Sequence, residues 1–214
     1  MADIDVKICG LTTAEAIEAA AASGAAYAGF NFFEASPRYI RPRDAMALVK
    51  HVPKSMKRVG IFVDPDDSLI DRAITAGRLD IVQLHGNEKP ERLKAIKGRH
   101  KVAVWKAISV STASDLEKAR RYEGTADLIL FDARTPKASR LPGGMGIAFD
   151  WKLLDRIKHK LPWGLSGGLS ADNIVEAIAV TSAPLVDVSS GVESVPGIKD
   201  PEKIAQFMEA VKAA

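Results

Sequence analysis

The stretch DVKICGLTTAEAIEAAAASGAAYAGF, residues 5–30, contains the unit that decides the fold. It begins with a β-rich apolar run, continues as an alanine-rich helical segment that Thr12 or Thr13 can cap, and ends in a second apolar run. Two strands joined by a crossover helix lie parallel in one sheet. The turn after the first run, Cys9-Gly10-Leu11-Thr12, lacks the G-x-G-x-x-G pattern that is typical of an open doubly wound sheet.

The same alternation of strand and helix continues to the end of the sequence. The eight expected strands are Asp5–Cys9, Ala26–Phe30, Arg58–Val63, Asp80–Leu84, Val102–Ala107, Leu128–Asp132, Pro162–Ser166 and Leu185–Ser189. The expected helices are Thr13–Ser23, Arg43–His51, Asp66–Gly77, Lys89–Lys97, Thr112–Tyr122, Trp151–Lys158, Asp172–Val180 and Pro201–Lys212. Eight such units predict an α/β fold of the TIM type, a (β/α)8 barrel in which residues 1–214 form a single domain. An open doubly wound sheet is the competing architecture.

The composition excludes several classes of protein. Of the 214 residues, 47% are hydrophobic, which excludes a disordered chain. Basic residues number 30 and acidic residues 27, so the net charge is only +3, and without a dense cationic cluster we expect no nucleic-acid partner. The single cysteine, Cys9, excludes an internal disulfide, and with only four scattered histidines a structural metal site is not expected.

The sequence also bears on location. We expect no secretory signal, because no basic segment precedes an apolar one near the N-terminus. The apolar stretch Ala19–Phe30 is interrupted by Ser23 and Gly24, and it is shorter than the roughly 20 residues that a helix needs to cross a bilayer. We therefore expect a cytoplasmic protein with no membrane partner.

The longest expected loop, Ala133–Ala148, follows the sixth strand and is rich in proline and glycine. A loop of this length in a compact chain is either a lid over a site or a passive surface excursion. The sequence leaves both interpretations open.

Polar side chains stand where the expected strands end. In a parallel barrel the active site lies at the carboxyl ends of the strands. The polar residues at those positions are Cys9, Asn31, His85, Asp132, Ser166, Ser189 and Ser190. Together they predict one site for a small molecule.

Two glycine-containing turns follow the seventh and eighth strands. Gly167 and Gly168 precede a helix, and Ser190 and Gly191 stand at the matching place on the next strand. Glycines let backbone N–H groups approach a ligand, and a helix N-terminus favours an anion. Either pair alone is more typical of an ordinary tight turn, but both pairs together at these two strands predict a phosphate site.

Cys9 is either a small buried apolar residue or a reactive thiol. Strand alternation places Lys7 on the same face as Cys9, and both point into the barrel if Val6 and Ile8 pack against helices. A neighbouring ammonium group favours the thiolate, which is the form that acts as a base. Because the first and eighth strands close the barrel, we expect an inner ion pair between Lys7 and Asp187.

Three further side chains are candidates for the site. Asp132 ends an apolar strand, where it is either a capping carboxylate or a general acid whose pKa is raised by burial. Arg38, in the turn Ser36-Pro37-Arg38-Tyr39, is either solvated or aimed at the barrel mouth, where it would bind a carboxylate through a forked pair of hydrogen bonds. His85, at the end of the fourth strand, has either a structural role or a contact with the substrate.

Taken together, these features resemble the phosphoribosylanthranilate isomerase family, barrel enzymes of tryptophan biosynthesis, nearly from end to end. The matching motifs are Lys7-Ile8-Cys9-Gly10-Leu11, Ser36-Pro37-Arg38-Tyr39, Gln83-Leu84-His85-Gly86, the strand end at Asp132, Phe149-Asp150-Trp151, Ser166-Gly167-Gly168-Leu169 and Val186-Asp187-Val188-Ser189-Ser190-Gly191-Val192-Glu193. Two departures are visible: Met145 stands where the family usually has threonine, and Ser166 replaces a common alanine. Met145 bears on how the long loop closes, and neither departure touches the expected acid or base.

The resemblance implies an Amadori rearrangement of an aminoaldose to an aminoketose. It assigns Asp132 as the general acid that protonates the furanose ring oxygen, and Cys9 as the general base that removes the C2′ proton. It also implies that Arg38 binds the anthranilate carboxylate and that both glycine turns hold the sugar phosphate. Such a reaction needs no metal ion and no cofactor, and the expected partner is a phosphosugar that carries an anthranilate group.

Two other functions fit parts of the pattern. The isomerase barrel of the histidine pathway performs the same rearrangement on a bulkier substrate, but that family relies on two aspartates, and a cysteine at the first strand end argues against it. A non-catalytic barrel that binds a phosphorylated ligand would need neither Cys9 nor Asp132. The sequence leaves open whether the protein is a monomer or a homodimer.

Overall fold

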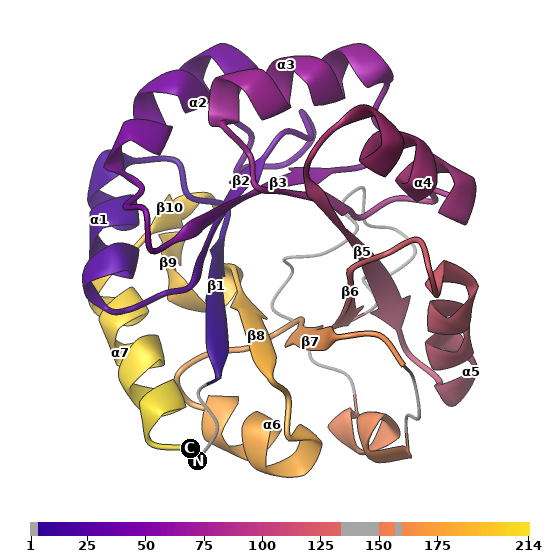
Figure 1. Cartoon of the computed structure of the whole chain (residues 1–214). Coiled ribbons are helices and arrows are strands. Elements are labelled where there is room, and N and C mark those ends of the chain that lie inside the picture. Colours follow the sequence, from indigo (N-terminus) through magenta and orange to yellow (C-terminus); the bar gives the residue numbers. More distant parts are fainter. Residues whose placement is uncertain (1–3, 134–149, 157–159) are drawn as a thin grey trace.

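A computed structural model describes residues 4–133, 150–156 and 160–214, and in it eight parallel strands close into a barrel (Figure 1). The strands are β1 (Asp5–Cys9), β2 (Tyr27–Asn31), β3 (Lys57–Phe62), β4 (Ile81–Leu84), β5 (Ala103–Val110), β6 (Leu128–Ala133), β7 (Trp163–Ser166) and β8 (Leu185–Val188). Each strand pairs with the next along the chain, and β8 pairs with β1 to close the ring. The predicted TIM-type barrel is therefore confirmed, and every predicted strand is present within a few residues of its expected bounds.

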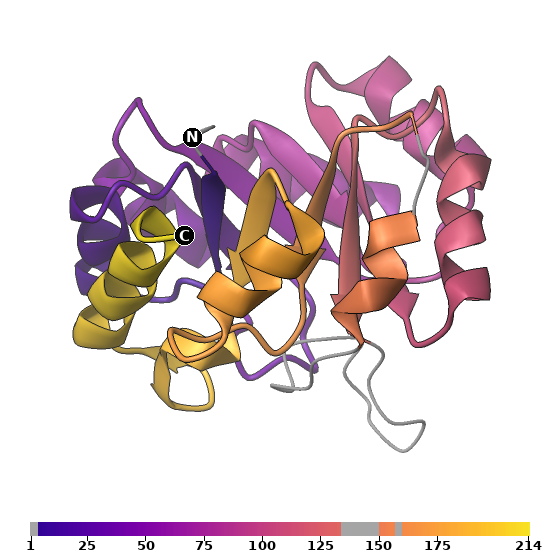
Figure 2. The same ribbon diagram turned by 90° about the horizontal axis from the view of Figure 1, so that it is seen from below.

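Helices surround the barrel on its outside (Figures 1 and 2). The α-helices of the described residues are α1 (Ala14–Ala22), α2 (Pro42–Leu48), α3 (Asp67–Gly77), α4 (Pro90–Arg99), α5 (Ala113–Leu116), α6 (Ile174–Thr181) and α7 (Pro201–Lys212). Short 3₁₀ helices are η1 (Val49–His51), η2 (Glu117–Tyr122), η3 (Trp151–Arg156) and η4 (Ser190–Val192). Side-chain caps fix several starts: the Thr13 hydroxyl accepts the Ala16 N–H before α1, so Thr13 is the cap of the two threonines that the sequence offers.

The structure differs from the sequence prediction in one helix and in one added hairpin. Thr112–Tyr122 is not one α-helix, because α5 ends at Leu116 and the chain continues in the tighter 3₁₀ geometry of η2. A short antiparallel hairpin, β9 (Glu193–Val195) with β10 (Ile198–Lys199), was not predicted. Its strands are too short to show an alternating pattern, and Gly197 turns the chain with a φ of 90°. This hairpin lies at the carboxyl end of the barrel (Figure 2).

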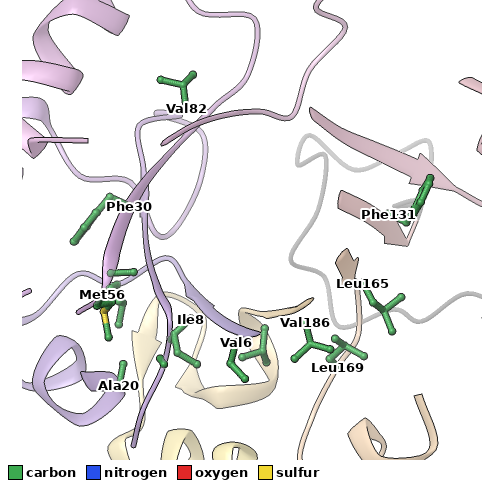
Figure 3. Packing of buried hydrophobic residues seen from close by; sticks show 14 of the residues in the cluster. Val6, Ile8, Ala20, Phe30, Met56, Val82, Phe131, Leu165, Leu169 and Val186 are labelled. Carbon is green, nitrogen blue, oxygen red and sulfur yellow. The ribbon is translucent and has the colours of Figure 1, made fainter. Parts of the chain in front are cut away.

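Successive side chains of β1 point alternately to the apolar layer outside the barrel and to the barrel interior. Val6 and Ile8 are buried in the apolar layer between strands and helices (Figure 3). The residue between them, Lys7, faces the barrel interior and stands opposite Asp187 in the β1–β8 register. The predicted division of this strand into an apolar outer face and a polar inner face is confirmed.

Some sequence predictions concern parts of the chain that the structure does not describe. Beyond Ala133, which ends β6, the predicted long loop lies outside the described residues, and so does Met145. Within residues 4–133, 150–156 and 160–214, no helix is long and apolar enough to span a membrane. The cytoplasmic location stays a prediction.

Candidate functional site

A cavity of about 60 Å³ lies at the carboxyl ends of the strands. All the polar strand-end residues that the sequence singled out line it: Cys9, Asn31, His85, Asp132, Ser166, Ser189 and Ser190. Barrel closure is what brings these residues together, because each strand contributes its last side chains to the same mouth. In the described part of the chain, no group of three or more His, Cys, Asp or Glu side chains is arranged to hold a metal ion.

The predicted ion pair between Lys7 and Asp187 is confirmed. The Lys7 Nζ atom lies 2.8 Å from Asp187 Oδ1, and both side chains are buried. Ser166 Oγ donates to the second carboxylate oxygen, Oδ2, at 3.3 Å. Burial alone would lower the pKa of Lys7, but the charges of Asp187 and Cys9 and hydrogen bonds to both raise it above its usual range. Burial also raises the pKa of Asp187, and the Lys7 ammonium acts against that rise.

The ionisation of Cys9 is a balance of opposing effects. Burial is the largest of these effects and raises the pKa of the Cys9 thiol. The ammonium groups of Lys7 and Lys199 lower this pKa, and the Asp187 carboxylate raises it. The predicted influence of Lys7 on the sulfur is therefore present: its ammonium lowers the pKa of the thiol, while burial raises it by more.

Asp132 and His85 meet across the mouth of the barrel. Asp132, the penultimate residue of β6, is only 2% exposed. His85 follows β4, and its Nε2 atom lies 3.1 Å from Asp132 Oδ2. That nitrogen is buried and has no well-directed hydrogen bond among the described residues. The two groups are close enough for a proton to pass between them, so His85 touches the predicted acid as well as lining the cavity.

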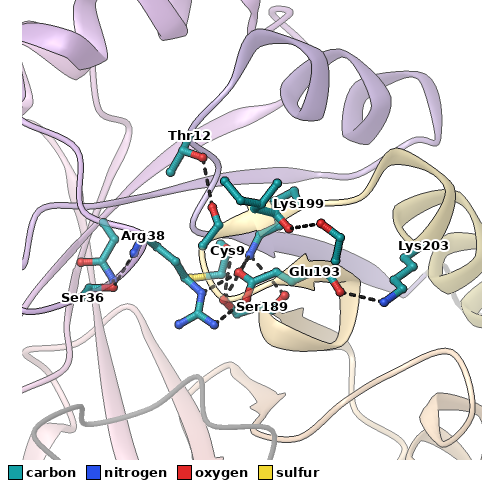
Figure 4. Close-up of polar contacts among 12 residues, drawn as sticks. Cys9, Thr12, Ser36, Arg38, Ser189, Glu193, Lys199 and Lys203 are labelled. Atoms are coloured by element: carbon teal, nitrogen blue, oxygen red, sulfur yellow. Dashed lines mark hydrogen bonds and ion pairs between the residues drawn. The ribbon is translucent and has the colours of Figure 1, made fainter.

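Arg38 forms a forked pair, but with a carboxylate of the protein. Its Nε and Nη2 atoms donate to Glu193 Oε1 and Oε2 at 2.7 and 2.8 Å, and both side chains are buried (Figure 4). Glu193 thereby fixes the plane of the guanidinium. Arg38 also lines the cavity, as the prediction that it is aimed at the mouth requires. Its contact with a substrate carboxylate stays a prediction.

The turns after β7 and β8 form one wall of the cavity. Gly167 and Gly168 have φ angles of 93° and 67°, in the left-handed region that favours glycine. The backbone N–H groups of Gly168, Leu169 and Ser190, three residues that line the cavity, donate no hydrogen bond to any described residue. Backbone donors are normally paired, so this wall is suited to an anion.

The helix after the first of these turns begins later than the sequence suggests. Gly168 does not stand directly at a helix N-terminus, because α6 starts only at Ile174, and the Asn173 side chain turns back to accept the Ser170 N–H. The second turn does lead straight into a helix, the short η4, which begins at Ser190. Any anion held here would therefore depend mainly on the backbone of the two turns.

Gly191 has a packing role between these turns. A Cβ atom at this position would lie 2.0 Å from the Leu169 carbonyl oxygen, so only glycine allows the two turns to approach this closely. Gly191 is not among the residues that line the cavity and stands behind its wall. Its predicted contact with phosphate stays a prediction.

Sequence reasoning missed three polar residues of this region. Glu193 and Lys199 are buried and come from the unpredicted hairpin, so no strand pattern pointed to them. Gln83 is 1% exposed and lines the cavity, and its Oε1 atom has no hydrogen-bond partner among the described residues. Gln83 alternates with His85 along the chain from β4, and that period of two was a signal that could have identified it.

Comparison with known proteins gives consistent matches over nearly the whole chain. Residues 6–210 match the family model described as N-(5'phosphoribosyl)anthranilate (PRA) isomerase. The N-(5'-phosphoribosyl)anthranilate isomerase of Zymomonas mobilis subsp. mobilis is 51% identical over 210 residues, which are 98% of each chain. Phosphoribosyl anthranilate isomerase from Thermotoga maritima, known from a crystal structure, has a TM-score of 0.86 and 38% identity, covering 99% of this chain and 100% of that one.

A further solved structure of a phosphoribosyl anthranilate isomerase contains a ligand. It holds reduced 1-(o-carboxyphenylamino)-1-deoxyribulose 5-phosphate. Its TM-score against this chain is 0.84 at 36% identity, and the match covers 99% of this chain and 100% of that one.

Proposed function

The chain belongs to the N-(5'-phosphoribosyl)anthranilate isomerase family, and we propose that Asp132 and Cys9 are the acid and the base of its reaction. The reaction converts N-(5-phosphoribosyl)anthranilate to 1-(2-carboxyphenylamino)-1-deoxyribulose 5-phosphate in L-tryptophan biosynthesis. It is an intramolecular Amadori rearrangement, in which a proton is added at the sugar ring oxygen and another is removed from C2′. One acid and one base therefore suffice on the protein side.

The two proton transfers occur in sequence. Asp132 donates its proton to the furanose ring oxygen, the bond between that oxygen and C1′ breaks, and the nitrogen lone pair forms an iminium. The Cys9 thiolate then accepts the C2′ proton, and the electrons of the broken C–H bond form an enolamine, which tautomerises to the ketone. Burial raises the pKa of the Cys9 thiol, and the ammonium groups of Lys7 and Lys199 lower it, so the two lysines favour the thiolate that the second transfer uses.

The observation that carries this proposal is the shared cavity. Cys9 comes from β1 and Asp132 from β6, which are not neighbours in the ring, and both side chains line the same cavity of about 60 Å³. A base and an acid that reach one small molecule from different directions can act on different atoms of it. A non-catalytic binding barrel has no need for this arrangement.

Anchors at the two ends of the substrate support the same assignment. The N–H groups of Gly168, Leu169 and Ser190, which donate to none of the described residues, suit the dianionic phosphate. Arg38, which Glu193 holds in place, presents positive charge toward the anthranilate carboxylate. Fixing both ends holds C2′ near the sulfur, and such positioning lowers the barrier without any further catalytic group.

The test is turnover of N-(5-phosphoribosyl)anthranilate, followed by the loss of anthranilate fluorescence. We expect Cys9→Ala and Asp132→Asn each to lower kcat by about 10²- to 10⁴-fold, the usual contribution of one acid or base. The matched control is Asp44→Asn, which removes an exposed carboxylate on α2 and should leave kcat unchanged. Turnover within a few-fold of the unchanged protein in either site variant would contradict the assignment.

Arg38 is tested separately through affinity. Arg38→Ala should mainly raise KM, because it removes a contact made to the carboxylate in both the ground state and the transition state. A fall in kcat with unchanged KM would show that Arg38 has another role. Binding of the product without any turnover by the unchanged protein would instead indicate a non-catalytic phosphosugar-binding barrel.

A further inference from the structure

The hairpin β9–β10 places a buried chain of charges beside Cys9. Glu193 binds Arg38 through its two carboxylate oxygens and also receives a close contact from the Lys199 ammonium (Figure 4). All three side chains are buried, with that of Lys199 fully enclosed. Two cations share one anion, so this cluster carries a net positive charge next to the catalytic cavity.

Lys199 also fixes the backbone that carries Cys9. Its Nζ atom donates to the Ser189 carbonyl oxygen at 3.2 Å and to Ser189 Oγ at 3.4 Å. Ser189 Oγ in turn donates to the Cys9 carbonyl oxygen at 3.1 Å. With the Glu193 carboxylate as third acceptor, each of the three ammonium hydrogens has a partner. The lysine thus joins the hairpin to the ends of both β8 and β1.

The charge of Lys199 acts electrostatically on the Cys9 sulfur. It lowers the pKa of the Cys9 thiol, as the ammonium of Lys7 also does. The charged or titratable groups that face Cys9 from the surrounding elements are Lys7, Arg38, His85, Asp132, Asp187 and Lys199. Of the two lysines, Lys7 is paired with Asp187, which itself raises the pKa of the thiol. Lys199 is paired with Glu193, whose single negative charge also balances Arg38, so the positive charge of Lys199 is only partly neutralised.

We propose that Lys199 is a positioning residue for the reaction: its buried ammonium holds Ser189 against the Cys9 backbone and supplies positive charge to the Cys9 sulfur. This role rests on the proposed function of Cys9 as the base. Lys199 does not line the cavity, so it acts on Cys9 and not on the substrate. Removing its charge should change kcat and leave KM nearly unchanged.

The experiment is the pH dependence of Cys9 alkylation by iodoacetamide, with no substrate present. Cys9 is the single cysteine of the chain, so the mass increase that is absent in Cys9→Ala reports on this thiol alone. In Lys199→Met the midpoint of the alkylation rate should move upward by about 1 to 3 pH units, the effect of losing one nearby opposite charge. Lys199→Arg keeps the charge and should restore the midpoint, and in parallel kcat should fall in Lys199→Met and recover in Lys199→Arg.

Lys203→Met is the matched control. Lys203 Nζ donates to the Glu193 carbonyl oxygen at 2.7 Å from α7, so this variant also removes a lysine bound to Glu193, but one that is not among the charges acting on Cys9. Its alkylation midpoint should equal that of the unchanged protein. If Lys199→Met does not fold, Lys199→Gln removes the charge but keeps N–H donors for Ser189 and Glu193, and it should show the same upward shift.

The outcomes separate this inference from the proposed function. A folded Lys199 variant with an unchanged alkylation profile, or an equal shift in Lys203→Met, would overturn the role of Lys199 while leaving Cys9 as the base. Full turnover by Cys9→Ala would overturn the base assignment, whatever the alkylation profiles show.

Discussion

Replacing Lys7 with methionine removes one half of a buried ion pair and leaves the other half without its partner. Lys7 and Asp187 are both buried, and Ser166 is the remaining side chain bonded to the carboxylate in the described part of the chain. Methionine has nearly the volume of lysine without its charge, so packing changes little. The expected loss of stability therefore comes from the isolated Asp187 carboxylate.

The size of this loss of stability follows from the free energy needed to protonate the Asp187 carboxylate. Without Lys7 the carboxyl folds in its protonated form, which costs about 1.36 kcal/mol for each pH unit above its ordinary pKa of 3.8. The loss of stability is then about 4 kcal/mol at pH 7 and about 2 kcal/mol at pH 5. The value at pH 7 lies within the roughly 3 to 5 kcal/mol that breaking a buried pair typically costs.

The sign of the pH dependence is specific. In the variant the pKa of the Asp187 carboxyl is raised in the folded state. The free energy of unfolding of the variant is therefore least reduced below pH 3.8, and it falls as the pH rises toward neutrality. Lys7→Met should therefore be closest to the unchanged protein in acid. The control Lys7→Met with Asp187→Asn carries no titratable group at this position, so its loss of stability should not vary between pH 5 and pH 7.

The assay is unfolding by urea, followed by tryptophan fluorescence at pH 5, 6 and 7, with the difference in free energy of unfolding between variant and unchanged protein as the readout. For a chain of this size the loss at pH 7 corresponds to a drop in Tm of roughly 8 to 16 °C. A difference below about 1 kcal/mol at pH 7, or one that grows as the pH falls, would refute the reasoning.

Three further predictions follow from the cavity. Gly191→Ala should raise KM and lower stability by about 1 to 3 kcal/mol, because its Cβ would overlap the Leu169 carbonyl oxygen; unchanged kinetics and unfolding would contradict this. Gln83→Leu should stabilise the protein by about 1 kcal/mol in thermal unfolding, because it removes a buried oxygen that accepts no hydrogen bond from the described residues, and should weaken substrate binding; a destabilised variant would show that this oxygen is satisfied. Alkylation of Cys9 in the unchanged protein should still be accelerating at pH 9.0, because burial raises the pKa of the thiol above that value, and a plateau reached below pH 8 would be inconsistent.

The parts of the site that could be predicted depend on local periodicity and on barrel closure. The Lys7–Asp187 pair follows from alternation along β1 and from the adjacency of β1 and β8, and both can be inferred from the order of strands. The strand-end residues share a cavity for the same reason. Family resemblance added the roles of Cys9 and Asp132, which strand position alone does not supply.

The parts that could not be predicted depend on contacts without a periodic pattern. The partner of Arg38 is Glu193, 155 residues away on a hairpin too short to recognise. The pKa of the Cys9 thiol depends on burial as well as on the nearby charges, and the neighbouring Lys7 alone indicates the opposite direction. The packing role of Gly191 appears only when the two turns are seen in contact.

The most direct test of the acid and base assignment follows the C2′ hydrogen itself. N-(5-phosphoribosyl)anthranilate carrying deuterium at C2′ is mixed with excess enzyme, and the deuterium released to water is measured in a single turnover. We predict rapid release by the unchanged protein and release slowed by about 10²-fold or more in Cys9→Ala, whose Asp132 can still open the ring. Release by Cys9→Ala at the rate of the unchanged protein would mean that another group removes this proton and that the account is wrong.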